Sequence, residues 1–517
     1  VVRQRAHAHA AGPHRMAVCY WGMTRSTALV YESHLAHVHI QHSPAVHTMS
    51  FDFDHAAGIR TINVTNCSLA DLPPKLLTLY PRLETLVASH NRIRQWDVAV
   101  GNGDEDAART TDTAPPTATS STGTDAAHAQ LRQLYLDYNA LTVLRPEVLG
   151  ALPNLRVLRV AHNGIATLQR GTFDLVPQLQ DLDLSFTALE ELDRDIFMHL
   201  RHLKHLSITD TSLMALPPGL FRGNTALVSL RLNSNVLRDV PAGVFDGLSS
   251  LVTLHLHRNE IQTLPRGLLR DLVALEVAFL GFNELQQVDA SLFASCHGLQ
   301  DVRLPANWLS RLPPNLFPHA PNLTHVLLSD NRLRSVDGVF DNASALERLE
   351  LDSNAITAFD AHLPNLRVLF MRNNPLRSFP AMHGLPMLRE LRLKDHRIPH
   401  IPLQAALAAS QHLHLLQLDA RASAHSVIVS DAGGSGRRGE GRASVDGRAA
   451  DLEVPAPPCG REDGAPRQQG LEPGRPRAPQ QLHPGGRQQE VGREGPGGRE
   501  PLPPPLKCLC TDARLRN

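Results

Sequence analysis

The sequence has little cysteine, few aromatic residues and no excess of charge of either sign. Its six cysteines are scattered and include no Cys-x-x-Cys pair: Cys19, Cys67, Cys296, Cys459, Cys508 and Cys510. This excludes a dense disulfide framework and a paired-cysteine zinc site. Lysine plus arginine (51) balance aspartate plus glutamate (51), so no overall charge points to nucleic acid as a partner. No apolar run approaches the roughly 18 residues of a membrane span, so we expect none in this chain.

Catalytic motifs are also missing from the sequence. We find no nucleophile elbow, no phosphate-binding loop and no paired-cysteine metal site. Enzymes that use a serine nucleophile, a nucleotide or a bound metal commonly carry such a motif. We therefore expect neither enzymatic activity nor a cofactor.

What the sequence does contain is a leucine-based phrase that recurs at a constant interval. Its first leucine stands at positions 131, 155, 179, 203, 227, 251, 275, 299 and 323. The phrase is Leu-x-x-Leu-x-Leu-x-x-Asn-x-Leu, and we number its residues from 1 at the first leucine. It resembles the leucine-rich repeat. The resemblance implies a horseshoe-shaped solenoid, with a parallel β-sheet on the concave face and loops and short helical turns on the convex face.

Looser copies of the phrase extend the repeats in both directions. They begin at Ile59, Leu83, Leu346, Leu366, Leu388 and Leu413, which gives about 14–15 units over residues 56–424. The flanks have a different composition: residues 1–55 are rich in histidine, and residues 425–517 are rich in glycine, proline and arginine. We expect both flanks to be poorly ordered. Residues 97–128 contain no phrase although the flanking phrases are two periods apart, so we expect a disordered insertion there.

The repeat phrase also predicts which side chains build the fold. Side chains alternate along a strand, so positions 4 and 6 point into a shared core and positions 3, 5 and 7 point outwards. Position 9 lies where the backbone leaves the strand, and an asparagine amide can both donate and accept there. The resemblance implies a ladder of these residues: Asn139, Asn163, Asn235, Asn259, Asn283, Asn307, Asn331 and Asn354. A recurring phenylalanine, as at Phe173 and Phe197, is expected to fill the convex-side core.

Outward-facing strand positions supply the candidate binding residues. Aromatic side chains beside arginine are typical of protein interfaces, and one such group comprises Arg231, His255, His257, Phe279, Phe282 and Arg303. A second, weaker group comprises Phe370 and Arg372. The alternative is that these rings only stack on neighbouring strands. The two histidines at positions 255 and 257 face the same way, but adjacent units offer no third ligand, so we predict no metal; a pH-sensitive contact is the other reading of this pair.

The compartment can be argued only from indirect signals. Residues 1–48 lack the basic start and apolar stretch of a secretory signal. Four Asn-x-Ser/Thr sequons nevertheless occur, at Asn63, Asn66, Asn322 and Asn342, and these are acceptors for N-glycosylation in secreted proteins. A repeat unit of this length, with its recurring phenylalanine, resembles those of secreted and cell-surface members of the family. We therefore expect an extracellular, glycosylated protein.

Three classes of function fit this architecture, because the fold does not choose among them. The first is a recognition protein of the innate-immune type, resembling insect leucine-rich immune proteins and Toll-like receptor ectodomains, that binds a protein or a microbial glycan or lipid. The second is an adhesion or extracellular-matrix protein, as in the chaoptin-like and connectin-like proteins. The third is a non-catalytic stabilising subunit of an enzyme. A dimer is compatible with each of these classes.

Overall fold

The computed structural model describes residues 17–21, 37–41, 58–96, 130–399, 401 and 412–418. The strands are β1 (Ala17–Trp21), β2 (His37–Gln41), β3 (Thr61–Asn63), β4 (Thr85–Val87), β5 (Gln133–Tyr135), β6 (Val157–Arg159), β7 (Asp181–Asp183), β8 (His205–Ser207), β9 (Ser229–Arg231), β10 (Thr253–His255), β11 (Val277–Phe279), β12 (Asp301–Arg303), β13 (His325–Leu327), β14 (Arg348–Glu350), β15 (Val368–Phe370), β16 (Glu390–Arg392) and β17 (Leu415–Gln417). The helices are α1 (Leu76–Leu79), α2 (Pro146–Gly150) and the 3-10 helix η2 (Met382–Gly384). The predicted insertion at 97–128 and the predicted tail at 425–517 lie outside the described residues.

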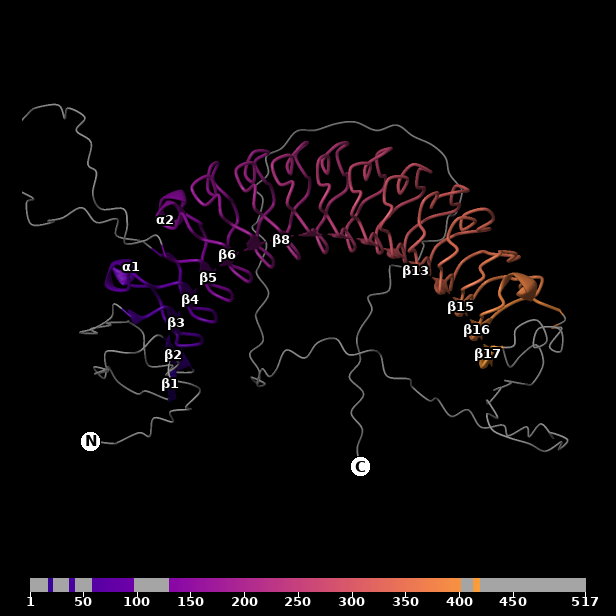
Figure 1. The fold of residues 1–517 in the computed structure, drawn as a ribbon, viewed down its shortest axis with the longest axis horizontal. Coiled ribbons are helices and arrows are strands. Elements are labelled where there is room, and N and C mark those ends of the chain that lie inside the picture. The colour runs from indigo at the N-terminus through magenta and orange to yellow at the C-terminus, as the bar shows by residue number, and fades with distance from the viewer. Residues whose placement is uncertain are drawn as a thin grey trace, which may run out of the picture. The chain divides into compact units, whose positions relative to one another are not determined.

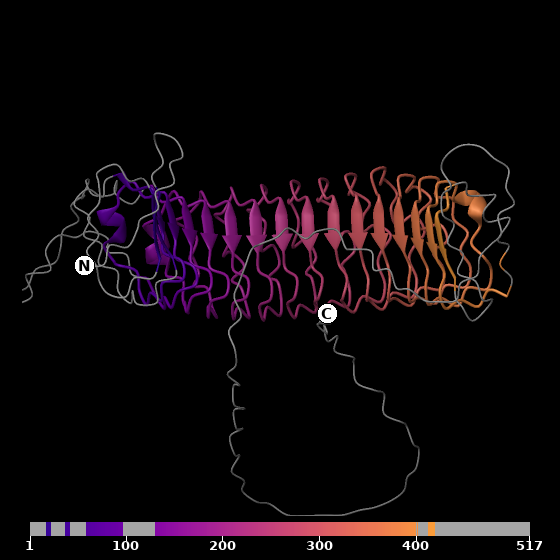
Figure 2. The ribbon, with the colours of Figure 1, turned by 90° about the horizontal axis from the view of Figure 1, so that it is seen from below.

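Each strand pairs in parallel with the next strand along the chain, which gives one sheet of 17 strands. Leu134 pairs with Leu158, and Leu158 pairs with Leu182. The expected solenoid is therefore confirmed. Its strands lie along the inner edge of the arc in Figure 1 and stand side by side, all pointing the same way, in Figure 2.

The sheet continues upstream of residue 56, where the sequence analysis began the solenoid. Strand β2 pairs with β3, and β1 pairs with β2. A weak copy of the repeat phrase accounts for β2, because Leu35, Val38 and Ile40 stand where positions 1, 4 and 6 fall one period before the Ile59 phrase. Valine and isoleucine in place of leucine made this copy hard to see in the sequence.

Strand β4 pairs directly with β5, although Leu86 and its partner Leu134 are two periods of the repeat apart in the sequence. The sheet therefore gains only one strand across these two repeat periods. The side-chain contacts across this step are the usual ones: Asn139 Nδ2 donates to the carbonyl of Ala88 at 2.9 Å, and Asn139 Oδ1 accepts from the backbone N–H of Ile93 at 3.0 Å. The regular stacking of turns is thus preserved on both sides of the segment predicted to be an insertion.

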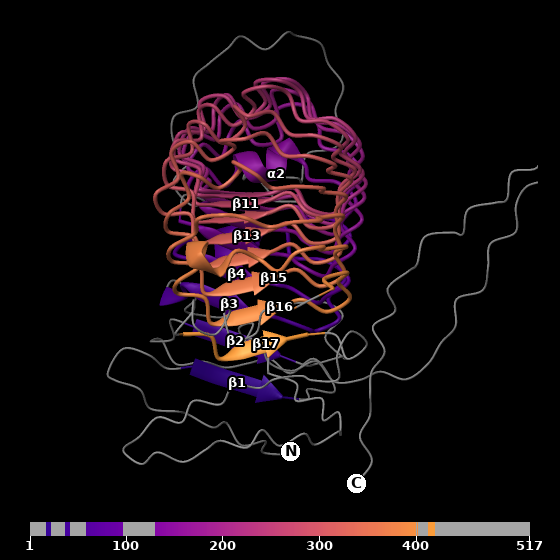
Figure 3. The same ribbon diagram turned by 90° about the vertical axis from the view of Figure 1, so that its right-hand side faces the viewer.

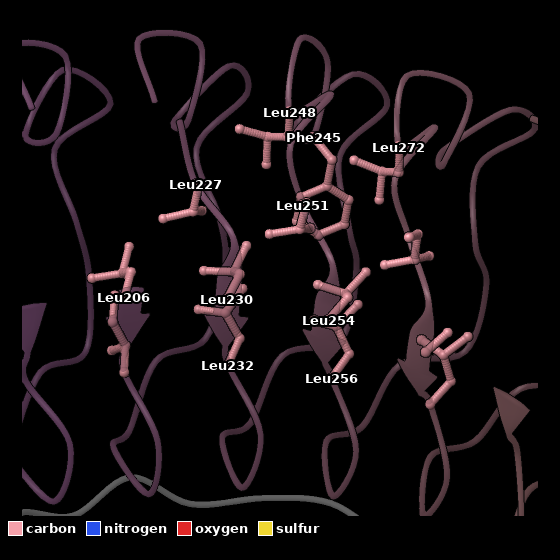
Figure 4. Close-up of a cluster of buried hydrophobic side chains, with 14 of the residues drawn as sticks. Leu206, Leu227, Leu230, Leu232, Phe245, Leu248, Leu251, Leu254, Leu256 and Leu272 are labelled. Carbon is pink, nitrogen blue, oxygen red and sulfur yellow. The ribbon is translucent and has the colours of Figure 1, made fainter. Parts of the chain in front are cut away.

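The core is a continuous column of leucine side chains between the sheet and the outer loops. Leu206, Leu230 and Leu254 occupy position 4 of successive units, are fully buried and lie side by side in Figure 4. On the outer side, phenylalanine rings from successive turns stack, with centroids 6.1 Å apart for Phe173 and Phe197 and 6.2 Å apart for Phe221 and Phe245. Each turn thus lies over the one before it, as the end view in Figure 3 shows.

Position 9 of the phrase links neighbouring turns through its side-chain amide. Asn259 Nδ2 donates to the carbonyls of Leu232 in the preceding turn and Leu256 in its own turn, both at 3.0 Å. Equivalent bonds recur at Asn91, Asn139, Asn163, Asn235, Asn283, Asn307, Asn331, Asn354 and Asn374. These amides replace the ladder partners that the backbone loses where it leaves the strand.

Helix contributes little to this fold. The two α-helices of the described residues, α1 and α2, contain four and five residues. Both lie on the outer edge of the arc in Figure 1. A membrane span requires a helix of roughly 20 residues, and none of the helices described here meets that requirement.

Candidate functional site

The strand register brings four position-5 side chains into one row on the concave face. Arg231 of β9 pairs with His255 of β10, His255 with Phe279 of β11, and Phe279 with Arg303 of β12. Neighbouring strands are about 4.8 Å apart, so these side chains stand next to one another. We call the following set the Phe279 cluster: Arg231, His255, His257, Arg258, Phe279, Phe282 and Arg303.

Phe279 is held between an imidazole and a guanidinium. The His255 ring meets it edge-on, with centroids 4.6 Å apart and an interplanar angle of 85°. On the other side, Arg303 Cζ lies 4.4 Å from the ring centroid in a cation–π contact. Asp301 fixes that guanidinium by accepting from both Nε and Nη2, the latter at 2.7 Å. The ring is therefore half-buried and fixed in orientation, which lowers the entropy cost of binding.

Phe282 is the most exposed ring of the cluster. It is 53% exposed and has a left-handed backbone with φ of 56°. Arg258, the equivalent residue one turn earlier, lies with Cζ 5.7 Å from the ring centroid. Gly281 has no side chain to cover the adjacent surface, and the ring of Pro305 lies against it. The Phe282 ring is thus open to another molecule.

The two histidines of the cluster are neutral at physiological pH. Burial, followed by the nearby Arg231, His257 and Arg303, lowers the pKa of His255 to about 4. Burial also lowers the pKa of His257, whose Nδ1 is buried and has no hydrogen-bond partner. This lowered pKa argues against His255 as the group that makes a contact sensitive to pH near neutrality. In the described part of the chain, no three His, Cys, Asp or Glu side chains gather as metal ligands would.

Positive charge at the cluster is only partly neutralised. Arg303 is paired with Asp301. By contrast, Arg231 and Arg258 are exposed and form no ion pair with any described residue. With both histidines neutral, the cluster therefore presents two rings beside two unneutralised guanidiniums.

In the second predicted group, Phe370 and Arg372, the aromatic ring is covered and not exposed as expected. Phe370 is only 6% exposed, because three guanidiniums cover its ring: Arg348, Arg372 and Arg392 lie 4.9, 5.9 and 4.2 Å from the centroid. Each of these arginines is also paired with a carboxylate, at Glu350, Asp352 and Glu390 respectively. The prediction that Phe370 offers an open aromatic surface is wrong. Arg372 is only half-buried, but its charge is neutralised by Asp352.

The sequence analysis missed a row of four stacked rings at position 8 of the repeat. His90, Tyr138, His162 and Phe186 stand on successive turns, with centroids 4.2, 3.9 and 4.0 Å apart and interplanar angles of 9–11°. We call this row the rim ladder. A signal was present in the sequence, since each ring immediately precedes the position-9 residue of its turn. The consensus phrase leaves position 8 unspecified, so the pattern was overlooked.

The four sequons differ in accessibility. Asn66, Asn322 and Asn342 are exposed. Asn63 is half-buried in β3, where its Oδ1 accepts from both the backbone N–H and the hydroxyl of Thr65, at 3.1 and 2.7 Å. Three of the four asparagines thus lie at the surface of the folded protein.

The leucine-rich repeat model matches residues 129–189, 177–237, 225–285, 297–356 and 321–376. A search of the curated proteins found no match. The family match therefore rests on the repeats themselves.

Solved structures with the same fold include the following three. A leucine-rich-repeat protein of Leptospira interrogans is 22% identical, covers 70% of this chain and 91% of its own, and has a TM-score of 0.55. Toll of Drosophila, in its complex with Spatzle, is 20% identical with a TM-score of 0.55; the match covers 75% of this chain but only 55% of Toll. A chain of the LRIM1/APL1C complex is 20% identical with a TM-score of 0.54, and the match covers 79% of this chain and 67% of that one. Residues 129–285 and 297–376 therefore match the leucine-rich repeat, and the fold of this chain resembles those of Toll and of the LRIM1/APL1C pair.

Proposed function

We propose that this chain is a non-enzymatic recognition protein that binds another protein through the Phe279 cluster on its concave face. The observation that carries the proposal is the exposed Phe282 ring beside the fixed Phe279 ring, with two unneutralised guanidiniums next to them. Interfaces concentrate their binding energy in aromatic and arginine side chains near the centre of the contact. The same chemistry favours a partner surface with apolar side chains bordered by carboxylates.

The proposed setting is extracellular, and the proposed role is of the innate-immune type. Two structures of the same fold are those of Toll in its complex with Spatzle and of the LRIM1/APL1C complex. Exposed sequons at Asn66, Asn322 and Asn342 support passage through the secretory pathway. An adhesion role would use the same surface, so the identity of the partner decides between the two.

The proposal is tested by capture from extracellular fluid of the source organism. The full chain, tagged and immobilised, is compared with Phe279→Ala/Phe282→Ala and with the control Leu175→Ala/Val273→Ala, which removes two exposed apolar side chains outside the strand rows. We expect a protein that is retained by the wild type and the control but lost, with at least a tenfold drop in affinity, from the Phe279 and Phe282 variant.

The alternative outcomes each have a clear meaning. Equal retention by all three forms would contradict the site. A captured glycan or lipid that is lost from the Phe279 and Phe282 variant would contradict a protein partner while supporting the surface. Retention of a second copy of this chain would identify a dimer interface instead. Thermal unfolding of each variant checks that the solenoid is intact.

A further inference from the structure

The rim ladder lies outside the Phe279 cluster. The charged side chains around the ladder are mainly negative, whereas those of the Phe279 cluster are positive. We propose that the rim ladder, together with Asp210, is a second binding site, and that it takes an arginine side chain in a basic segment of a partner protein. The contacts of the rim ladder support this site whether or not the Phe279 cluster binds a partner.

The ladder is held in place before any ligand arrives. Its residues have left-handed backbones, with φ of 55° at Tyr138 and 53° at Phe186. The solenoid repeats this geometry at each turn, so the rings meet face to face about 4 Å apart. Tyr138 and Phe186 are nevertheless 46% and 45% exposed. A row of aromatic side chains that is both ordered and exposed is unusual unless another molecule covers it.

Stacking determines which parts of the rings a ligand can reach. The faces of Tyr138 and His162 are covered on both sides by their neighbours. A sugar, which would lie flat on an aromatic face, therefore has no platform on these two rings. At the Phe186 end the row stops, because the equivalent residue of the next turn is Asp210. The outer face of Phe186 is thus turned toward Asp210.

Asp210 provides a carboxylate at this open face. The backbone N–H of Phe186 donates to the carbonyl of Thr209 at 2.8 Å, which fixes Asp210 in the next turn. Asp210 is exposed, and its carboxylate forms no ion pair with the described residues. Burial lowers the pKa of the nearby His162 ring, and the carboxylates of Asp137, Asp183 and Asp210 oppose that shift.

The part of the concave face next to the ladder is acidic. Positions 3, 5, 7 and 8 of the turns that contain β5 to β8 hold four carboxylates, at Asp137, Asp181, Asp183 and Asp210, and one guanidinium, at Arg159, whereas the cations Arg132, Arg156 and Lys204 stand at position 2, before the strands. Arg159 is paired with Asp181 at 3.5 Å. The uncompensated charge is therefore negative, which favours a cationic ligand and opposes an acidic one.

Arginine fits these features better than lysine does. Its planar guanidinium can lie flat on the face of Phe186 and present a row of donors to a carboxylate, whereas a lysine ammonium is a point charge that cannot stack. The edges of the other rings would then contact the methylene groups of the same or the next side chain. A protein segment with exposed arginines supplies this chemistry.

The test measures binding of fluorescein-labelled hexa-arginine and hexa-lysine peptides to the full chain by anisotropy. The variants are Phe186→Ala and Asp210→Asn. The control is Glu147→Gln, which removes one exposed carboxylate on the outer helix α2. We expect the wild type and the control to bind hexa-arginine more tightly than hexa-lysine, by about threefold.

Each variant should change a different quantity. Phe186→Ala should abolish the preference for arginine, because the stacking face is gone. Asp210→Asn should weaken both peptides by about threefold to tenfold. Equal affinities of the wild type for the two peptides, no binding, or unchanged binding by both variants would each overturn the proposal. Phe186 and Asp210 are exposed, and the Asp210→Asn arm keeps the test decisive if Phe186→Ala fails to fold.

Discussion

The side-chain oxygen of Asn259 accepts a hydrogen bond at 3.2 Å from the backbone N–H of Leu237, one turn earlier in the solenoid. The amide nitrogen of the same residue donates to the carbonyls of Leu232 and Leu256. One buried side chain thus satisfies backbone groups of two turns. The concave face can carry large, exposed rings because this ladder and the leucine column, and not the surface side chains, hold the turns together.

The first prediction concerns this ladder. Asn259→Ala should lower the free energy of unfolding by about 1–3 kcal/mol, because it leaves buried backbone groups of two turns without partners. Asn259→Thr should cost less, since Thr187 occupies position 9 of its own turn and donates to the carbonyl of Leu184 at 2.7 Å. Urea unfolding measures both. As a control, Asn233→Ala removes a half-buried asparagine outside the ladder, and an equal loss there would argue against a special role for position 9.

The second prediction concerns pH. Burial and the neighbouring arginines lower the pKa of His255 to about 4 in the folded protein, whereas an unfolded histidine titrates near 6.5. A lowered pKa means that the folded state resists protonation. The contribution of His255 to the free energy of unfolding is therefore fully present above about pH 6.5 and is lost as the pH falls toward 4.

We expect the wild type to lose on the order of 1–3 kcal/mol more unfolding free energy than His255→Gln between pH 7.5 and 4.5. Urea unfolding at the two pH values provides the measurement. Identical losses in the two proteins would show that His255 is not the group responsible. By the same reasoning, partner binding at the Phe279 cluster should not change through titration of His255 between pH 7.5 and 5.5.

The repeat period made most of the fold predictable. Once leucines recur at a fixed interval, the strand register, the inward direction of Leu134 and the outward direction of Phe279 follow from alternation along the strand. The position-9 asparagines follow from the same phrase. The strand at β2 was missed because Val38 and Ile40 replace leucines of the phrase.

The surface was less predictable, because it depends on how side chains from several turns arrange themselves. Phe370 is outward by register, yet Arg372 of its own turn and Arg348 and Arg392 of the two neighbouring turns cover it. The row of Tyr138 and Phe186 depends on a left-handed residue at position 8, which the consensus does not specify. Register predicts which face a side chain occupies, but not which neighbour covers it.

The third prediction concerns Gly281, which lies between the two rings of the Phe279 cluster in sequence. A Cβ at this position would lie 2.6 Å from Pro305 Cδ and 2.8 Å from its Cγ, so the chain must shift to accept it. Gly281→Ala should therefore cost about 1–3 kcal/mol of unfolding free energy. Gly164→Ala is a matched control, because the nearest atom to its Cβ would be a carbonyl oxygen at 3.5 Å. If Gly281→Ala were as stable as the control, Pro305 would have to move freely, and the packing of Pro305 against Gly281 would not be a fixed part of the site.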